Sequence, residues 1–204
     1  MSVADEPIPV KFFTAVLFVV REQADNAREK LQQHFGPTDY VSPAFPFQCE
    51  EYYAREMGTP IRRIFFSFRE LIDPAALAES KWLCHDIEQE LAQAGKRTVN
   101  IDAGYLDYHK VVLASFKGNN QKIYLGRGVY ADMNLLYGKG SFSPFPWTFP
   151  DFRDKTYEPV LLHMRSLYKG AVRHILAEKQ RGTASDEAQK AESAGESPPA
   201  GDGG

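Results

Sequence analysis

The first half of the chain alternates between strand-like and helix-like hydrophobic patterns. Residues 10–20 are nearly all apolar, which is typical of a central strand buried on both faces of a sheet. Residues 24–34 carry apolar side chains at helical spacing, residues 61–68 form a second strand-like run, and residues 73–94 form a second helical stripe. This strand–helix–strand–helix order predicts parallel βαβ winding.

The second half is rich in short strand-like segments and closes with a helix. Residues 98–101, 110–116 and 122–137 have strand-like composition, and residues 117–121 contain the Gly and Asn residues of a hairpin turn. Residues 157–178 carry apolar side chains at helical spacing. Together the two halves predict an α/β (α+β) fold with a single mixed sheet, parallel βαβ in its first half and antiparallel in its second half, and about three main helices.

Composition and charge separate a body from a tail. The chain has 204 residues, a net charge of −3 and 43% hydrophobic residues, which is enough for one substantial core. Residues 180–204 contain two basic and five acidic residues, which accounts for the whole net charge and leaves 22 residues of each sign in residues 1–179. We therefore predict a single mixed α/β domain over residues 1–179. We predict a disordered acidic tail over residues 180–204, because its composition cannot offset the entropy of ordering.

The sequence indicates neither a membrane nor a strong nucleic-acid partner. A body that is neutral overall lacks the excess of cations that coats a phosphate backbone. The longest apolar run, residues 12–20, is far shorter than the roughly 20 residues that span a bilayer, and residues 1–7 are acidic, unlike a signal peptide. The two cysteines, Cys49 and Cys84, form no disulfide framework. We therefore expect a cytoplasmic protein.

Asp102 is the leading candidate for a functional side chain. It follows a predicted strand, and ligands of open α/β sheets gather beyond the carboxyl ends of strands. There it would act as a metal ligand, a general base or a partner for a ligand hydroxyl, unless Asp102 and Gly104 only shape a turn. Glu50 or Glu51 would join Asp102 in holding a divalent cation through oxygen ligands. The alternative is that both acids face water on an exposed helical turn.

Arginines and lysines supply a candidate anion site. Arg62 and Arg63 point to opposite faces of a predicted strand. At least one of them then needs a carboxylate or an anionic ligand, since an unpaired buried charge is costly. Lys122 and Arg127, with Lys110, would complete a site that grips a phosphate or a carboxylate. An internal ion pair would explain a buried arginine equally well.

Aromatic side chains near these charges would stack on a flat ligand group. The candidates are Tyr105, Tyr124 and Trp147, with Asp151 as a polar member of the block 147–153; the alternative is that the rings fill the core. The sequence contains no phosphate loop, no G-x-G-x-x-G opening a helix, no H-E-x-x-H, no G-x-S-x-G and no paired Cys/His zinc spacing. We therefore assign no catalytic residue, and the pattern leaves open whether the protein is an enzyme.

Several short motifs follow one another along the chain, among them PVKFF at 9–13, FGPTDY at 35–40, VNID at 99–102, GYL at 104–106 and WTFPDFR at 147–153. With these motifs, residues 9–175 resemble a bacterial family known as domain of unknown function 4416. The family pattern usually has proline in place of Ala103 and a His-Arg pair in place of Gln121-Lys122. Some members carry a GTP-binding label, which implies nucleotide binding, although this chain lacks a phosphate loop.

Two functions from different classes follow from these observations. The first is the binding of an anionic or phosphate-bearing small ligand, with nucleotides as one candidate class, together with a divalent cation as a candidate cofactor. The second is a protein-interaction module without catalysis, which would use the proline- and aromatic-rich residues 141–152. Binding of single-stranded RNA by the strand-rich half is a weaker alternative, because the neutral body speaks against it.

Overall fold

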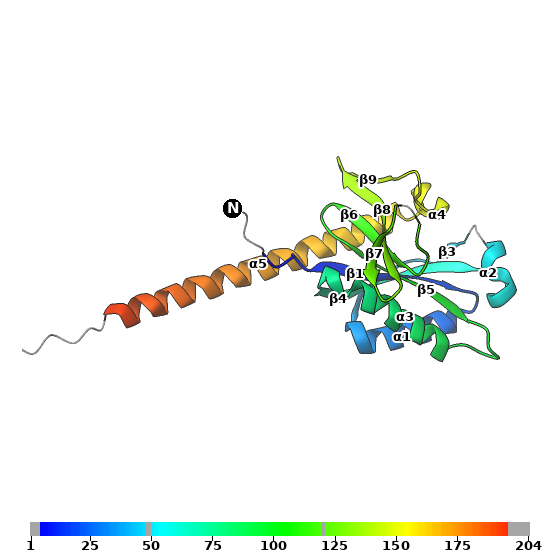
Figure 1. Cartoon of the computed structure of the whole chain (residues 1–204), viewed down its shortest axis with the longest axis horizontal. Helices are drawn as coiled ribbons and strands as arrows, with labels where there is room; N and C mark the ends of the chain where they lie inside the picture. Colours follow the sequence, from blue (N-terminus) through cyan, green and yellow to red (C-terminus); the bar gives the residue numbers. More distant parts are fainter. Residues whose placement is uncertain (1–4, 48–49, 120, 196–204) are drawn as a thin grey trace, which may run out of the picture. The chain divides into compact units, whose positions relative to one another are not determined.

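The computed structural model describes residues 5–47, 50–119 and 121–195 (Figure 1). Contacts within this part divide the chain into a first unit that ends at Tyr168 and a second unit that begins at Lys169. The first unit contains the sheet, and the second contains the later turns of helix α5, Glu158–Gly195. Within the described residues, no helix is long and apolar enough to cross a membrane.

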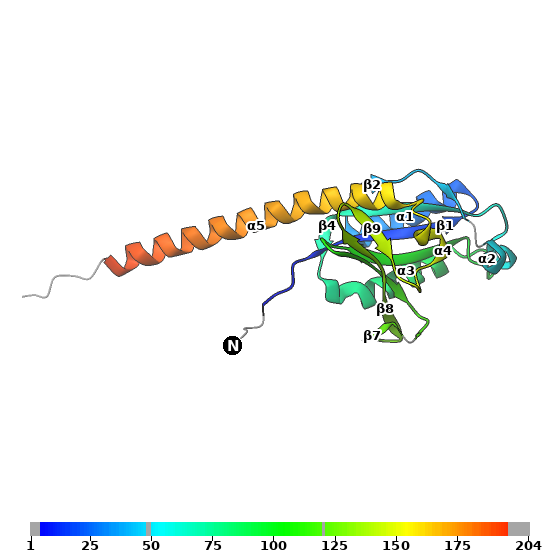
Figure 2. The same cartoon turned by 90° about the horizontal axis from the view of Figure 1, so that it is seen from above.

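Every pair of neighbouring strands in the described sheet is antiparallel. The strand order is β2–β4–β1–β5–β6–β8–β7, with β3 beside β4 and β9 beside β8. Strands β2 and β7 therefore lie at opposite edges of the sheet (Figure 2). The strands are β1 Val10–Phe18, β2 Thr38–Val41, β3 Phe45–Pro46, β4 Arg62–Ile72, β5 Val99–Leu106, β6 Lys110–Ser115, β7 Ile123–Gly126, β8 Val129–Gly138 and β9 Ser141–Pro144.

The predicted parallel βαβ first half is wrong. Strand β1, helix α1 (Arg21–Phe35) and β2 do follow one another, but β4 lies between β1 and β2 and is antiparallel to both. In the same way β1 lies between β4 and β5, which helix α3 (Leu77–Glu90) connects. Each strand–helix–strand unit is thus split by a strand of the other unit. Hydrophobic periodicity reports the order of elements and not their pairing, so adjacent and split units have the same sequence pattern.

Strand β1 is buried along its whole length, as its uniform apolar pattern predicted. On one face, Phe12 belongs to a core cluster that includes Leu31 of α1 and Cys84 of α3, and these two helices lie side by side (Figure 1). On the other face, Phe65 of β4 packs its ring edge-on against Tyr157, with ring centroids 4.8 Å apart. The centre of the sheet is therefore a layer between two apolar layers.

The predicted hairpin turn lies elsewhere in the structure. Strands β6 and β7 both pair with β8, so residues 117–121 connect two strands that flank a third. The hairpin turn joins β7 to β8 instead, where Arg127 and Gly128 have positive φ angles of 52° and 74°. Two successive left-handed residues are typical of a type I′ turn. The predicted strand 122–137 is therefore two strands with a turn between them.

The helices begin close to their predicted positions. A 3₁₀ turn, η1 (Pro74–Ala76), precedes α3, and Asp73 caps it by accepting a hydrogen bond of 2.7 Å from the backbone N–H of Ala75. The short helices are α2 (Glu50–Met57) and α4 (Pro150–Arg153). Helix α5 extends to Gly195, past the predicted end near residue 178. Side chains from residue 178 onward and all of residues 196–204 lie outside the described part, so the domain boundary at residue 179 and the disordered tail stay predictions.

Candidate functional site

The site forms where two neighbouring strands separate. Strand β5 pairs with β6 only through Gly104, Tyr105 and Leu106, so the earlier residues of β5 have no strand partner on that side. Side chains of α3 take the place of the missing strand. The backbone N–H of Ile101 donates to the carboxylate of Glu88, and Lys81 Nζ donates to the carbonyl oxygen of Ile101 at 2.9 Å. The local divergence of the strands leaves a polar gap beside Asp102.

A cavity of about 390 Å³ occupies this gap. Its walls come from α2, α3, β5, β6, β8 and the segment before α4, and they combine charged side chains with aromatic rings. The rings that line it are those of Tyr52, Tyr53, Phe116, Trp147 and Phe149. A volume of this size falls in the range of small-molecule sites, roughly 300–1,000 Å³.

Two of the four Lys and Arg side chains that line the cavity are neutralised by carboxylates. Arg97 grips Glu56 with two parallel bonds, Nε–Oε1 at 2.8 Å and Nη2–Oε2 at 2.6 Å. These bonds lower the pKa of the Glu56 carboxyl. Lys122 Nζ lies 3.3 Å from the Asp132 carboxylate, and both side chains are buried. These two cations are already engaged within the protein.

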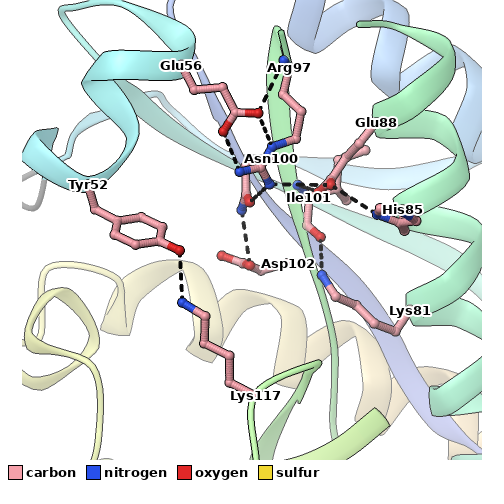
Figure 3. Close-up of polar contacts among 10 residues, drawn as sticks. All are labelled: Tyr52, Glu56, Lys81, His85, Glu88, Arg97, Asn100, Ile101, Asp102 and Lys117. Carbon is pink, nitrogen blue, oxygen red and sulfur yellow. Dashed lines mark hydrogen bonds and ion pairs between the residues drawn. The ribbon is translucent and has the colours of Figure 1, made fainter. Parts of the chain in front are cut away.

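The other two cations, Lys81 and Lys117, form no ion pair with any described carboxylate. Lys81 is 7% exposed, and its one described hydrogen bond goes to the Ile101 carbonyl. Lys117 is exposed and donates to the hydroxyl of Tyr52 at 3.0 Å. Figure 3 shows Lys117 with Tyr52 on one side of Asp102 and Lys81 on the other. Since an ammonium group has three donors, both lysines retain donors for a ligand.

Asp102 lies between these two lysines, and Asn100 and Arg63 donate hydrogen bonds to its carboxylate. Asn100 Nδ2 donates to its Oδ1 at 3.1 Å, and Arg63 Nη2 donates to its Oδ2 at 3.2 Å. Its side chain remains 28% exposed. A carboxylate accepts about four hydrogen bonds, so Asp102 keeps acceptor capacity toward the cavity.

A second cavity of about 230 Å³ adjoins the first at Asp102. Most of its wall is apolar, and it also contains Arg63 and Asp151, which form a buried ion pair with each other. The Arg63 guanidinium lies over the ring of Phe47, 4.8 Å from its centroid, and 5.4 Å from that of Phe152. Arg63 thus makes the internal ion pair that was the alternative to an anion site.

The structure brings some of the predicted site residues together. Asp102, Lys122 and Trp147 line the larger cavity, and Arg63 and Asp151 line the smaller cavity together with Asp102. These five residues come from β4, β5, the end of the loop before β7 and the segment around α4. Sequence positions that are as much as 88 residues apart meet here.

Other predicted residues line neither cavity. Arg62 is exposed and donates to the Ala44 carbonyl. The Arg127 guanidinium lies over the Trp82 ring, Tyr124 packs on Tyr130, and Tyr105 packs against the core cluster. The strand alternation of Arg62 and Arg63 was predicted correctly, but Arg127 does not join either of them at a cavity.

A metal site and a cysteine nucleophile gain no support from the geometry. Within the described residues, no group of three or more His, Cys, Asp or Glu side chains is arranged to hold a metal ion. Glu51 is exposed and lines neither cavity, and the side chain of Glu50 lies outside the described part. Burial raises the pKa of the Cys84 thiol to about 12, so Cys84 is a thiol rather than a reactive thiolate at neutral pH.

The sequence did contain a signal for the two α3 side chains that were missed. Leu77, Lys81, Cys84 and Glu88 follow one another at helical spacing, and all four are buried. A lysine and a glutamate therefore interrupt the apolar stripe of this helix, where a charged side chain needs a specific partner. Loop residue Lys117 carries no comparable signal.

Comparison with known proteins identifies the family of this chain. Residues 8–168 match the family described as a domain of unknown function, DUF4416. Because the match covers most of the chain and nearly all of the first unit, the protein belongs to this family. Neither a curated protein nor a solved structure gave a match.

Proposed function

We propose that the protein binds a small anionic, phosphate-bearing molecule in the larger cavity beside Asp102. The observation that carries the proposal is Lys81. Its ammonium group is almost fully buried and donates to one backbone carbonyl. Its charge partly offsets the burial that raises the pKa of Glu88, but the two side chains form no direct ion pair. Burying a charge that no direct ion pair offsets is costly, and a bound phosphate oxygen would supply a direct partner.

The simplest alternative role for Lys81 is to satisfy the unpaired carbonyl of Ile101. A neutral donor on α3 would do this without the desolvation cost of an ammonium group. Glu88 offsets the positive charge only through space, so a direct anionic partner is the feature that the site still lacks. Lys117 adds a second cation to the same cavity, and Tyr52 and Phe149 add aromatic faces at its wall. Charge and rings together favour a ligand that has both a phosphate and a flat group.

A thermal-shift and calorimetry screen tests the proposal. Inorganic phosphate, pyrophosphate, sugar phosphates and nucleotides are titrated with and without magnesium into the full chain. A ligand present at 100 times its Kd stabilises the folded state by about 2.7 kcal/mol, which is visible as a rise in Tm.

The variant Lys81→Met keeps the aliphatic stem and removes the charge, and Lys169→Met replaces an exposed lysine that lines neither cavity. We expect Lys81→Met to lose the ligand-induced rise in Tm and Lys169→Met to keep it. Absence of binding by every phosphate-bearing probe, or full binding by Lys81→Met, would refute the proposal.

A protein-interaction surface over residues 141–152 is the second candidate function. Trp147 and Phe149 are 39% and 47% exposed, which favours contact with a partner. Both rings also line the cavity, so the same exposure suits a ligand. A pull-down with Trp147→Ala and Phe149→Ala distinguishes the two, because a changed set of bound proteins without any effect on phosphate binding would favour the interaction surface.

The proposed ligand fits a protein of the cytoplasm, where phosphorylated metabolites are abundant, and we propose this location. The sequence-based reason is the absence of a disulfide framework. In the described structure Cys84 is a free, buried thiol. Localisation of a tagged full-length chain by cell fractionation checks this, and recovery in a secreted fraction would contradict it.

A further inference from the structure

The two cavities of the site share a wall. The residues that line both are Tyr52, Tyr53, Asp102, Leu113, Lys117 and Phe149. The two cavities therefore adjoin, and Asp102 lies at the junction. A ligand that spans both must match the chemistry of each part.

The two parts differ in the charge they offer. The larger cavity presents Lys81, which forms no direct ion pair with a described carboxylate, and it therefore suits the anionic end of a ligand. In the smaller cavity the charged side chains of Arg63 and Asp151 are engaged with each other. Apart from Asp102 and Lys117 on the wall shared with the larger cavity, what remains there for a ligand is the apolar surface of Phe47, Pro150 and other rings. The smaller cavity thus suits an uncharged, flat group, since every nucleobase has a face that stacks on an aromatic ring.

The junction presents hydrogen-bonding groups that suit hydroxyls. Asp102 has acceptor capacity left after its bonds to Asn100 and Arg63. A carboxylate repels a phosphate but accepts hydrogen bonds from neighbouring hydroxyl groups. Tyr53 lines the same junction, and burial, with the nearby charge of Asp102, raises the pKa of its hydroxyl to about 12. At neutral pH the Tyr53 hydroxyl is protonated and can donate to a ligand oxygen.

From this order of groups we propose that the ligand is a ribonucleoside 5′-phosphate. Its phosphate binds to Lys81 and Lys117, its ribose hydroxyls donate to Asp102, and its base enters the smaller cavity beside Phe149. The inference rests on the proposed function, because it requires that the larger cavity holds a phosphate. It goes further in naming the class of molecule and the residue that selects for ribose.

Isothermal titration calorimetry with three kinds of probe tests this assignment. The probes are ribose 5-phosphate, the four ribonucleoside 5′-monophosphates, and 2′,3′-dideoxyadenosine 5′-monophosphate. Stacking of a base is worth about 1–3 kcal/mol, which corresponds to roughly a 5- to 150-fold gain in affinity. At least one ribonucleoside monophosphate is therefore expected to bind about fivefold or more tightly than ribose 5-phosphate, and adenosine monophosphate more tightly than its dideoxy analogue.

Two variants separate the base and ribose contributions. Phe149 is 47% exposed, so Phe149→Ala should fold normally and lose affinity for the nucleotide but not for ribose 5-phosphate. Asp102→Asn should weaken adenosine monophosphate and leave the dideoxy analogue unchanged. The control Tyr124→Ala removes an exposed ring outside both cavities and should change nothing.

The outcomes distinguish the two levels of the proposal. If ribose 5-phosphate binds as tightly as every nucleotide and Phe149→Ala has no effect, the nucleotide assignment is overturned, while Lys81-dependent phosphate binding still stands. If adenosine monophosphate and its dideoxy analogue bind equally to the wild type and to Asp102→Asn, the role of Asp102 is overturned. If no phosphate-bearing probe binds, both the assignment and the proposed function fall.

Discussion

Replacing Asp151 by asparagine should be among the most destabilising single changes beside the site. The side chains of Arg63 and Asp151 are 5% and 7% exposed, and the guanidinium is also surrounded by aromatic rings. Removing one partner of a buried ion pair typically costs 3–5 kcal/mol, because the remaining charge is left uncompensated. Asp102 stays 3.2 Å from the guanidinium, so we expect the lower end, about 3 kcal/mol.

Urea unfolding followed by tryptophan fluorescence measures this cost. For m-values of about 1–3 kcal/mol/M, a loss of about 3 kcal/mol lowers the unfolding midpoint by at least roughly 1 M. The double variant Arg63→Met/Asp151→Leu removes both charges and should cost less than Asp151→Asn alone, since apolar replacement of a buried pair is often neutral. Asp25→Asn breaks an exposed pair with Arg21 and serves as the control. Its expected effect is about 0.2–1 kcal/mol.

Two results would contradict this reasoning. If the free energy of unfolding of Asp151→Asn lies within about 1 kcal/mol of the wild-type value, the Arg63 guanidinium is less desolvated than its surroundings indicate. If the double variant is less stable than Asp151→Asn, the attraction between Arg63 and Asp151 stabilises the folded state by more than the cost of desolvating the two charges. The ion pair would then be a net source of stability, and the comparison with the exposed control would give its size.

Three further predictions concern other parts of the first unit. Gly104→Ala should destabilise the fold by about 1–3 kcal/mol, measured by thermal unfolding, because an added Cβ would lie 2.7 Å from Leu113 and 2.8 Å from a backbone carbonyl of β6; unchanged stability would show that β5 and β6 can separate there. Arg97 lowers the pKa of Glu56, so the stability advantage of the wild type over Glu56→Gln should be present near neutral pH and be lost as the pH falls below 4.5 toward the lowered pKa; a difference independent of pH would exclude the ion pair as its source. Cys84 should be alkylated by iodoacetamide only after unfolding, as followed by peptide mass spectrometry, because the side chain is buried and its thiol is protonated; rapid labelling of the native protein would contradict the burial.

The sequence was a better guide to the elements than to their pairing. The apolar run of β1 and the Asp73 cap before α3 are local signals, and both are found where predicted. The pairing of strands depends on contacts between residues far apart in the chain, such as Ala15 of β1 opposite Phe65 of β4. A periodic pattern carries no information on those contacts. This is why an antiparallel sheet of split units was predicted as a parallel one.

Only part of the candidate site was predicted, because its residues also come from elements that are far apart in the sequence. Asp102 was selected because it follows the predicted strand 98–101, whereas in the structure it lies inside β5. The lysine on which the proposed anion site depends lies on α3. There, Lys81 and Glu88 bond to the backbone of Ile101 where β6 no longer does. A charged residue in the apolar stripe of a helix can thus mark the place where a sheet opens, since an unpaired strand edge needs polar partners. The Lys81 ammonium group donates to the Ile101 carbonyl and still has N–H donors left for a ligand in the cavity. Other members of the family that keep the opening between β5 and β6 should therefore keep a polar donor at the position of Lys81, and those that bind an anion should keep its charge.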